Sequence, residues 1–132
     1  MHQDIIEVIQ SLKNLRHLRP ATKTDVLVAE NALGVHFAED FKTYALAYGV
    51  ITAKGVEITG ISESPRLNVA DVTMKERALN SNIPENMYVI ESTGAEGIVI
   101  LQDETGCIYA LAPNGTPKAL YSSLADYLRS LQ

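Results

Sequence analysis

The chain has 132 residues, of which 46% are hydrophobic and 20% are charged, with 8 Gly, 5 Pro and 1 Cys. This composition excludes a disordered chain, a collagen-like repeat and a disulfide framework, and the length predicts a single domain over residues 1–132. The longest apolar run, Cys107–Ala112, is far too short for a membrane span. We expect a cytoplasmic protein, because the first ten residues do not resemble a secretory signal and a lone cysteine cannot form an internal disulfide.

The net charge of −5 is concentrated in the middle of the chain. Residues 57–104 carry nine acidic and three basic side chains, a net charge of −6. If these carboxylates share a face, their field repels nucleic acid and attracts a basic partner. A solvated acidic surface that improves solubility explains the same pattern. In either case, direct binding to nucleic acid is not expected.

The first third of the chain predicts three short helices. Residues 4–18, 25–33 and 39–48 each place apolar side chains at spacings of three and four residues, which is typical of an amphipathic helix. Gly34 and Gly49 follow the second and third of these segments, where a left-handed residue commonly ends a helix.

The apolar spacing then changes from helical to strand-like. Residues 56–58 indicate a short strand, residues 69–79 a helix, and the segment after Ser123 an amphipathic C-terminal helix. Four further strands are predicted, with loops short enough to permit only antiparallel pairing: 87–91, 97–102, 107–112 and 117–121. The predicted fold is α+β, with short N-terminal helices, an antiparallel β-meander of about four to six strands, and a C-terminal helix packed on the sheet.

The sequence contains no common catalytic signature. The P-loop, the Gly-x-Gly-x-x-Gly fingerprint and the Gly-x-Ser-x-Gly elbow are all absent. His36 with Glu39 or Asp40 would make a poor metal site, and Cys107 fits a buried strand position better than a nucleophile. We therefore expect no enzyme activity, no cofactor and no metal. The alternative of a small enzyme or ligand-binding protein requires a deep pocket with convergent polar groups.

Several short motifs occur in a characteristic order over residues 24–130. They are Ala29-Glu30-x-x-Leu33-Gly34-Val35, Phe37-x-Glu39-Asp40-Phe41-Lys42, Tyr48-Gly49, Gly55-x-Glu57-Ile58-x-Gly60-Ile61, Val89-Ile90, Gly106-x-Ile108-Tyr109 and Ser122-Ser123-Leu124-Ala125-Asp126-Tyr127-Leu128. This order resembles the SUKH superfamily, also called the Smi/Knr-type domain. The resemblance implies a mixed α+β domain without a catalytic centre. Many bacterial members are immunity proteins that neutralise a partner toxin, often a nuclease, and others are regulatory interaction modules.

The resemblance and the acidic segment together predict an immunity protein that blocks a cognate toxin by stoichiometric occlusion. The expected partner is a basic, nuclease-like toxin domain, and the alternative is a regulatory protein–protein interaction module without a toxin partner. The binding face and the oligomeric state are left open by the sequence. The residues expected to contact the partner are the acids Glu57, Glu63, Asp71, Glu76 and Glu96, with Tyr88 and Tyr109 as aromatic support.

Overall fold

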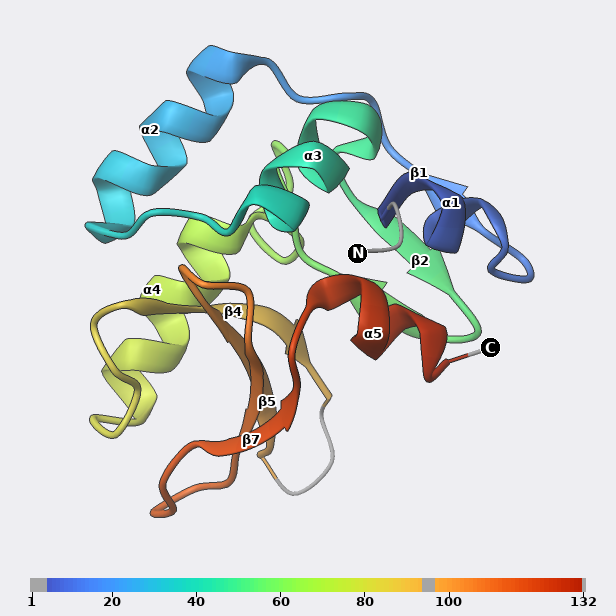
Figure 1. The fold of residues 1–132 in the computed structure, drawn as a ribbon. Helices are drawn as coiled ribbons and strands as arrows, with labels where there is room; N and C mark the ends of the chain where they lie inside the picture. The colour runs from blue at the N-terminus through green and yellow to red at the C-terminus, as the bar shows by residue number, and fades with distance from the viewer. Residues whose placement is uncertain (1–4, 94–96, 132) are drawn as a thin grey trace.

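The computed structural model describes residues 5–93 and 97–131, and it confirms the α+β fold (Figure 1). The helices are α1 (Ile5–Gln10), α2 (Lys23–Leu33), α3 (Glu39–Tyr48), α4 (Val69–Leu79) and α5 (Leu124–Arg129). The strands are β1 (Arg16–His17), β2 (Ile51–Ala53), β3 (Val56–Ile58), β4 (Met87–Ser92), β5 (Val99–Asp103), β6 (Ile108–Leu111) and β7 (Lys118–Tyr121). No helix in this described part of the chain combines the length and apolar character needed to cross a bilayer.

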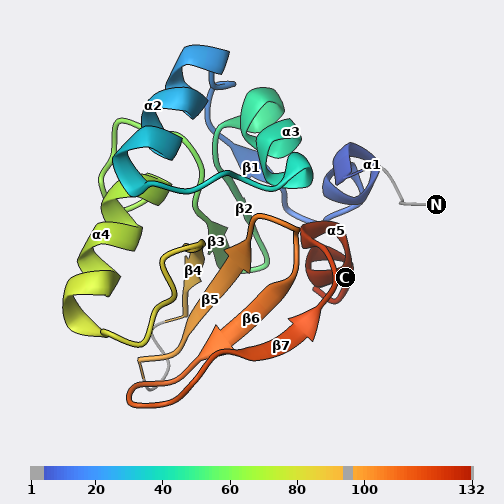
Figure 2. The same cartoon turned by 60° about the vertical axis from the view of Figure 1, so that its left-hand side comes forward.

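The predicted meander forms one antiparallel sheet with the strand order β4-β5-β6-β7. Figure 2 shows this curved sheet with α4 beside β4 and α5 beside β7. Val89 and Leu101 on one face pack with Val72 of α4. Ile100 and Ile108 on the other face belong to the core cluster shared with the remaining helices. Both faces are therefore covered, which explains why these strands are apolar in successive positions.

A second antiparallel sheet has the order β1-β2-β3. Its β2–β3 hairpin turns at Lys54 and Gly55, whose φ angles of 52° and 77° are those that a tight two-residue hairpin turn needs. Thr59 joins the two sheets, because its N–H donates to the carbonyl oxygen of Ile90 at 2.9 Å and its hydroxyl donates to that of Val89 at 2.8 Å. A β-bulge leaves Ile90 out of the β4–β5 register, so its carbonyl is free for this contact.

The helix predicted over 4–18 is wrong in its length, since α1 ends at Gln10. Asn14 has a φ of 59°, and this left-handed conformation is incompatible with a continuing helix. Arg16–His17 pairs instead with β2 as an edge strand. Backbone pairing with a distant segment thus overrides the apolar periodicity, although Leu12 of the same stripe still reaches the core.

The other helix predictions agree closely with the structure. The observed bounds of α3 and α4 are those predicted, and α2 begins two residues earlier than expected. Thr22 and Asp25 form a reciprocal capping box at the start of α2. Gly34 ends α2 in the predicted left-handed conformation, whereas Gly49 ends α3 with φ 71° and ψ −72°, which is positive in φ but outside that conformation.

Three backbone segments cross at Gly49 and Gly60. A Cβ atom on Gly60 would lie 1.7 Å from the carbonyl oxygen of Gly49, and one on Gly49 would lie 2.1 Å from that of Arg19. The same carbonyl of Gly49 accepts a hydrogen bond from the N–H of Ile61 at 3.0 Å. This crossing fixes the segment that leads from β3 into α4 against the end of α3, and so it positions the first of the two surfaces described below.

Candidate functional site

A groove of about 730 Å³ lies between α4, β3 and the segment that connects them, and we call it the α4 groove. It brings together three of the acidic residues that the sequence predicted as partner contacts. Its lining residues are Glu57, Thr59, Pro65, Arg66, Leu67, Asp71, Val72, Lys75, Glu76 and Ser92. Residues far apart in the acidic central segment therefore share one concave surface, on β3 and on α4.

The carboxylates of the α4 groove differ in their partners. Glu57 forms an ion pair with Arg66, and both side chains are largely exposed. Asp71 accepts a hydrogen bond of 2.8 Å from the side-chain amide of Asn68, which is neutral. The side chain of Glu76 makes no ion pair or hydrogen bond within residues 5–93 and 97–131. Exposed ion pairs contribute little to stability, so these carboxylates are free to exchange their contacts for those of a partner.

Two other predicted acids do not join this groove. Glu63 forms an ion pair of 3.0 Å with Arg19, and both side chains are strongly exposed. It lines a separate hollow beside residues 18–21 and Asp25. Glu96 lies outside the residues that the structure describes. The acidic face predicted from charge alone is thus divided between at least two surfaces.

Tyr88 is wrong as a surface anchor, because its side chain is completely buried. Its ring packs against Phe37 and Phe41, with centroid distances of 4.8 and 5.1 Å. Its hydroxyl accepts a hydrogen bond from the N–H of Ala38 at 2.9 Å and donates one to Gln102 Oε1 at 2.7 Å. The aromatic strand residue predicted to face a partner instead organises the core.

Tyr109 is half-buried, and its role as a partner contact stays a prediction. Its hydroxyl donates to Asp103 Oδ2 at 2.8 Å. This hydrogen bond to a carboxylate, together with burial, raises the pKa of Tyr109 to about 12. Burial alone would raise the pKa of Asp103, but hydrogen bonds from Thr105, Tyr109 and Cys107 outweigh it, and the pKa is lowered.

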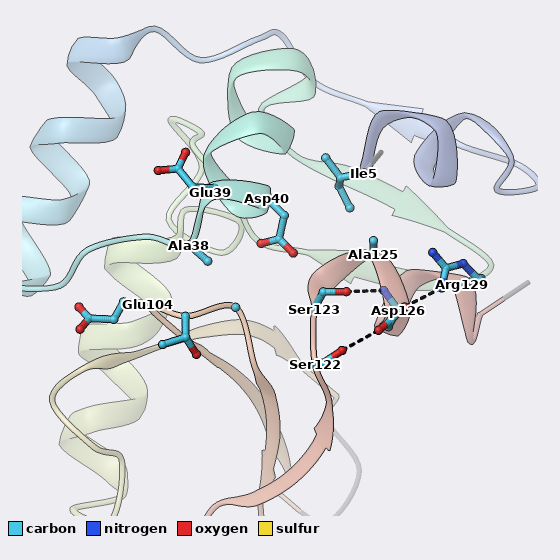
Figure 3. A pocket seen from close by; sticks show the side chains of 12 residues that line it. Ile5, Ala38, Glu39, Asp40, Glu104, Ser122, Ser123, Ala125, Asp126 and Arg129 are labelled. Carbon is cyan, nitrogen blue, oxygen red and sulfur yellow. Dashed lines mark hydrogen bonds and ion pairs between the residues drawn. The ribbon is translucent and has the colours of Figure 1, made fainter. Parts of the chain in front are cut away.

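A second hollow, of about 590 Å³, lies where the start of α3, the β5–β6 turn and the start of α5 meet, and we call it the α5 pocket (Figure 3). Its lining residues are Ile5, Ala38, Glu39, Asp40, Glu104, Thr105, Gly106, Ser122, Ser123, Ala125, Asp126 and Arg129. Ile5, Ala38 and Ala125 are buried and give the pocket an apolar component. Figure 3 shows Glu39 and Glu104 at one end, Asp126 and Arg129 at the other, and Asp40 between them.

Asp40 is fixed at the centre of the α5 pocket by two neutral donors. The N–H of Leu124 donates to its Oδ2 at 2.7 Å, so a carboxylate from α3 caps the first turn of α5. The side-chain amide of Gln102 donates to its Oδ1 at 3.0 Å and to the carbonyl oxygen of Gly106 at 3.1 Å. Burial raises the pKa of Asp40, and these hydrogen bonds oppose that rise only in part.

The other charges of the α5 pocket are divided into paired and unpaired groups. Glu39 forms an ion pair of 3.0 Å with Lys42, and Asp126 forms one of 2.6 Å with Arg129. Hydrogen bonds from Ser122 and Arg129 lower the pKa of Asp126. Glu104 is exposed, and its side chain has no ion pair or hydrogen bond in the part of the chain that the structure describes.

Two further features concern the metal-ligating side chains and the single cysteine. Within the described ranges, no group of three or more His, Cys, Asp and Glu side chains is placed to hold a metal ion. Cys107 is a half-buried free cysteine whose N–H donates to Asp103 Oδ1 at 3.1 Å. Both hollows instead offer carboxylates over apolar side chains, an arrangement that suits binding to a cationic surface.

The α5 pocket was not predicted from the sequence, which considered Asp40 only as a poor metal ligand beside His36 and as part of a motif. The pocket is built from segments near residues 40, 105 and 125, whose proximity no local pattern predicts. One signal was present in Gln102, a polar residue at the end of an apolar strand. A buried amide of this kind needs hydrogen-bond partners and therefore marks a buried polar network.

Helices followed by an antiparallel meander and a closing helix define this chain as an α+β domain, and carboxylates line two of its hollows. The family model described as SMI1-KNR4 cell-wall, SUKH_5, matches residues 2–131. The chain therefore belongs to the SMI1-KNR4 family within the SUKH superfamily, as its ordered motifs predicted. Comparison with curated proteins gave no match.

Proposed function

We propose that this protein is an immunity protein that neutralises a cognate toxin by binding it stoichiometrically and covering its working surface. The family supports a binding role of this kind. The observation that carries the proposal is the α4 groove, in which Glu57, Asp71 and Glu76 line one concave surface. A toxin that acts on nucleic acid presents basic residues where it holds the backbone, and the excess of carboxylates over the cations Arg66 and Lys75 in the groove complements such a surface.

Electrostatic complementarity acts first on the rate of association. Carboxylates such as Glu76, which has no cationic partner among the described residues, extend their field into solvent and steer a basic partner toward the groove. The Arg66–Glu57 ion pair is exposed and can reorganise at small cost when a partner arrives. Neutralisation in this mechanism needs no bond to be made or broken, and one copy of the chain inactivates one toxin molecule.

The test uses the toxin domain encoded beside the gene for this chain, in a rescue assay and in binding kinetics. The variant Asp71→Lys/Glu76→Lys reverses the groove, and the matched control Glu7→Lys/Glu85→Lys reverses two exposed acids elsewhere. We expect the groove variant to associate about tenfold more slowly at low salt, with a smaller difference at high salt. The control variant should associate at close to the native rate.

Three outcomes would contradict the proposal. A native chain that neither binds this toxin domain nor rescues cells that express it overturns the immunity function and favours a regulatory interaction module. Equal slowing by the groove variant and the control assigns the effect to net charge and removes the groove from the mechanism. Turnover of a substrate by the purified chain, abolished by one side-chain change, would replace binding by catalysis.

A further inference from the structure

The turn between β6 and β7 contains the one asparagine of the chain that precedes a glycine, Asn114 before Gly115. This turn lies at the end of the last hairpin of the sheet (Figure 2). Asn114 is exposed, and its side chain makes no hydrogen bond within residues 5–93 and 97–131. A glycine has no side chain that shields its backbone nitrogen. The nitrogen of Gly115 is therefore sterically free to close a ring onto the side-chain amide carbon of Asn114.

The folded turn opposes this ring closure. The N–H of Gly115 donates to the carbonyl oxygen of Ala112 at 3.0 Å. Pro113, followed by a φ of 63° at Asn114, is typical of the two central residues of a type II turn. The nitrogen can attack only after it has lost its proton. The reaction therefore requires the hydrogen bond to Ala112 to open first.

Contacts from two other segments keep the turn closed. In the loop between α4 and β4, Asn82 Nδ2 donates to the carbonyl oxygen of Gly115 at 2.7 Å. The backbone N–H of Asn82 donates to Asn80 Oδ1 at 2.9 Å, which fixes this loop in turn. A Cβ atom on Gly97 would lie 2.8 Å from Cγ of Pro113, so the turn also lies directly against residue 97. The opening of the turn thus depends on distant contacts, and the bond from Asn82 is the one nearest the reacting nitrogen.

We propose that Asn114 is a site of spontaneous deamidation and that the side chain of Asn82 controls the rate. The Gly115 nitrogen gives its proton to water or hydroxide and forms a bond to Cγ of Asn114. The bond from Cγ to Nδ2 then breaks, and ammonia leaves with a proton from the solvent. Water adds to either carbonyl group of the resulting succinimide, and the ring opens to aspartate or isoaspartate. This inference is independent of the proposed function, because it involves no partner.

Either product changes this end of the sheet. Aspartate adds a negative charge to the turn. Isoaspartate carries the main chain through Cβ of residue 114 and so lengthens the backbone by a methylene group. Gly115 then cannot keep both its N–H bond to Ala112 and its carbonyl bond to Asn82. A chain modified in this way loses the link between the β6–β7 hairpin and the loop before β4.

The test follows the purified full chain at mildly alkaline pH and physiological temperature by peptide mass spectrometry. A synthetic peptide of residues 110–118 gives the rate of the same reaction without the fold. We expect the native chain to react about tenfold more slowly than the peptide, because the turn must first open. Asn82→Ala should react about fivefold faster than the native chain, because it lacks one hydrogen bond of the turn. Asn114→Gly, which can adopt the same φ, should abolish the reaction.

Asn86→Ala is the matched control, since Asn86 is exposed in the same loop and its side chain makes no hydrogen bond to any described residue. It should react at the native rate. Hydrogen exchange of the Gly115 amide reports the opening directly, and it should accelerate in Asn82→Ala alone. A native rate equal to that of the peptide, equal rates in the Asn82 and Asn86 variants, or earlier modification at Asn80, which precedes a serine, would each overturn the inference.

Discussion

The α4 groove and the α5 pocket both present carboxylates beside apolar side chains, but they hold them in different ways. In the groove, Glu57 pairs with Arg66 across an exposed surface, and the side chain of Glu76 has no partner in the described part of the chain. In the pocket, Asp40 belongs to a network that continues through Gln102 to the buried hydroxyl of Tyr88. The acids of the groove can therefore change without affecting the fold, whereas the central acid of the pocket is part of what holds the fold together.

This difference separates two ways of building an acidic binding surface. A surface of exposed acids controls encounter rates and adapts to different partners, because each side chain is independently mobile. A surface built on a buried hydrogen-bond network is preorganised, and it keeps its geometry only while that network is intact. A protein that must recognise one partner quickly and then hold it gains from having both.

The largest expected effect is a loss of stability when the hydrogen-bond network around Gln102 at the α5 pocket is broken. Gln102→Leu removes the acceptor for the Tyr88 hydroxyl and the donor to Asp40, and it leaves these polar groups buried without a partner. We expect the free energy of unfolding to fall by about 3 kcal/mol. Urea denaturation followed by circular dichroism measures this loss, since the chain has no Trp for fluorescence.

The groove supplies the matched comparison for that experiment. Asp71→Asn/Glu76→Gln removes two exposed charges and should change the free energy of unfolding by no more than about 0.5 kcal/mol. Equal losses of unfolding free energy in the two variants would mean that the acids of the groove support the fold as much as the network of the pocket does. That result would contradict the comparison.

A smaller effect is expected in the pH dependence of stability. The pKa of Asp40 is raised in the folded state, so its proton stabilises the fold below the unfolded pKa of about 3.9, and this contribution is lost as the pH rises through the folded pKa. Asp40→Asn should remove that component from the curve of unfolding free energy against pH. The difference between native and variant curves should therefore change across this acidic window.

Asp126 gives the control with the opposite sign. Its pKa is lowered by hydrogen bonds from Ser122 and Arg129, so its contribution is present above the unfolded pKa and lost as the pH falls through the folded pKa. Asp126→Asn should therefore reduce the loss of unfolding free energy at low pH. Asp40→Asn should leave that loss in place. Identical changes in both variants would show that burial does not set the protonation of Asp40.

The smallest effect concerns a cation of the groove. Arg66→Ala removes the exposed partner of Glu57 and should lower the free energy of unfolding by less than about 0.5 kcal/mol. The same change makes the groove more negative, so association with a basic partner should become faster at low salt and more sensitive to salt. Stopped-flow binding measures both, and a slower association would show that Arg66 itself contacts the partner.

Elements with strong local signals could be predicted from the sequence. The helices at 39–48 and 69–79 and the four strands of the meander follow from apolar spacing and from glycine or asparagine at their ends. Strand β2 was missed because a strand of three residues, Ile51–Ala53, is too short to show a periodicity of its own. The helix over 4–18 was overextended, since its second half is decided by pairing with β2 and not by its own pattern.

The candidate surfaces were predictable only in part, for a related reason. Charge counting identified the acidic segment, and the fold does bring Glu57, Asp71 and Glu76 into one groove. Counting charges does not show whether the side chain of Tyr88 is buried. An apolar strand can hold buried and exposed aromatic residues alike, and the elements packed against it decide which side chains are covered. The structural role of Asp40 was not predicted, because its partners, Gln102 and Leu124, are 62 and 84 residues away in the sequence.

The backbone crossing at Gly49 and Gly60 limits which other sequences can adopt this fold. Any methyl group at position 60 would overlap the carbonyl oxygen of residue 49, so even alanine cannot be accommodated there without separating the two segments. A Cβ atom at position 49 would overlap a different carbonyl, that of Arg19, so each glycine is required for its own reason. Surface acids around the groove carry no such restriction, and their charges can vary while the crossing point stays unaltered.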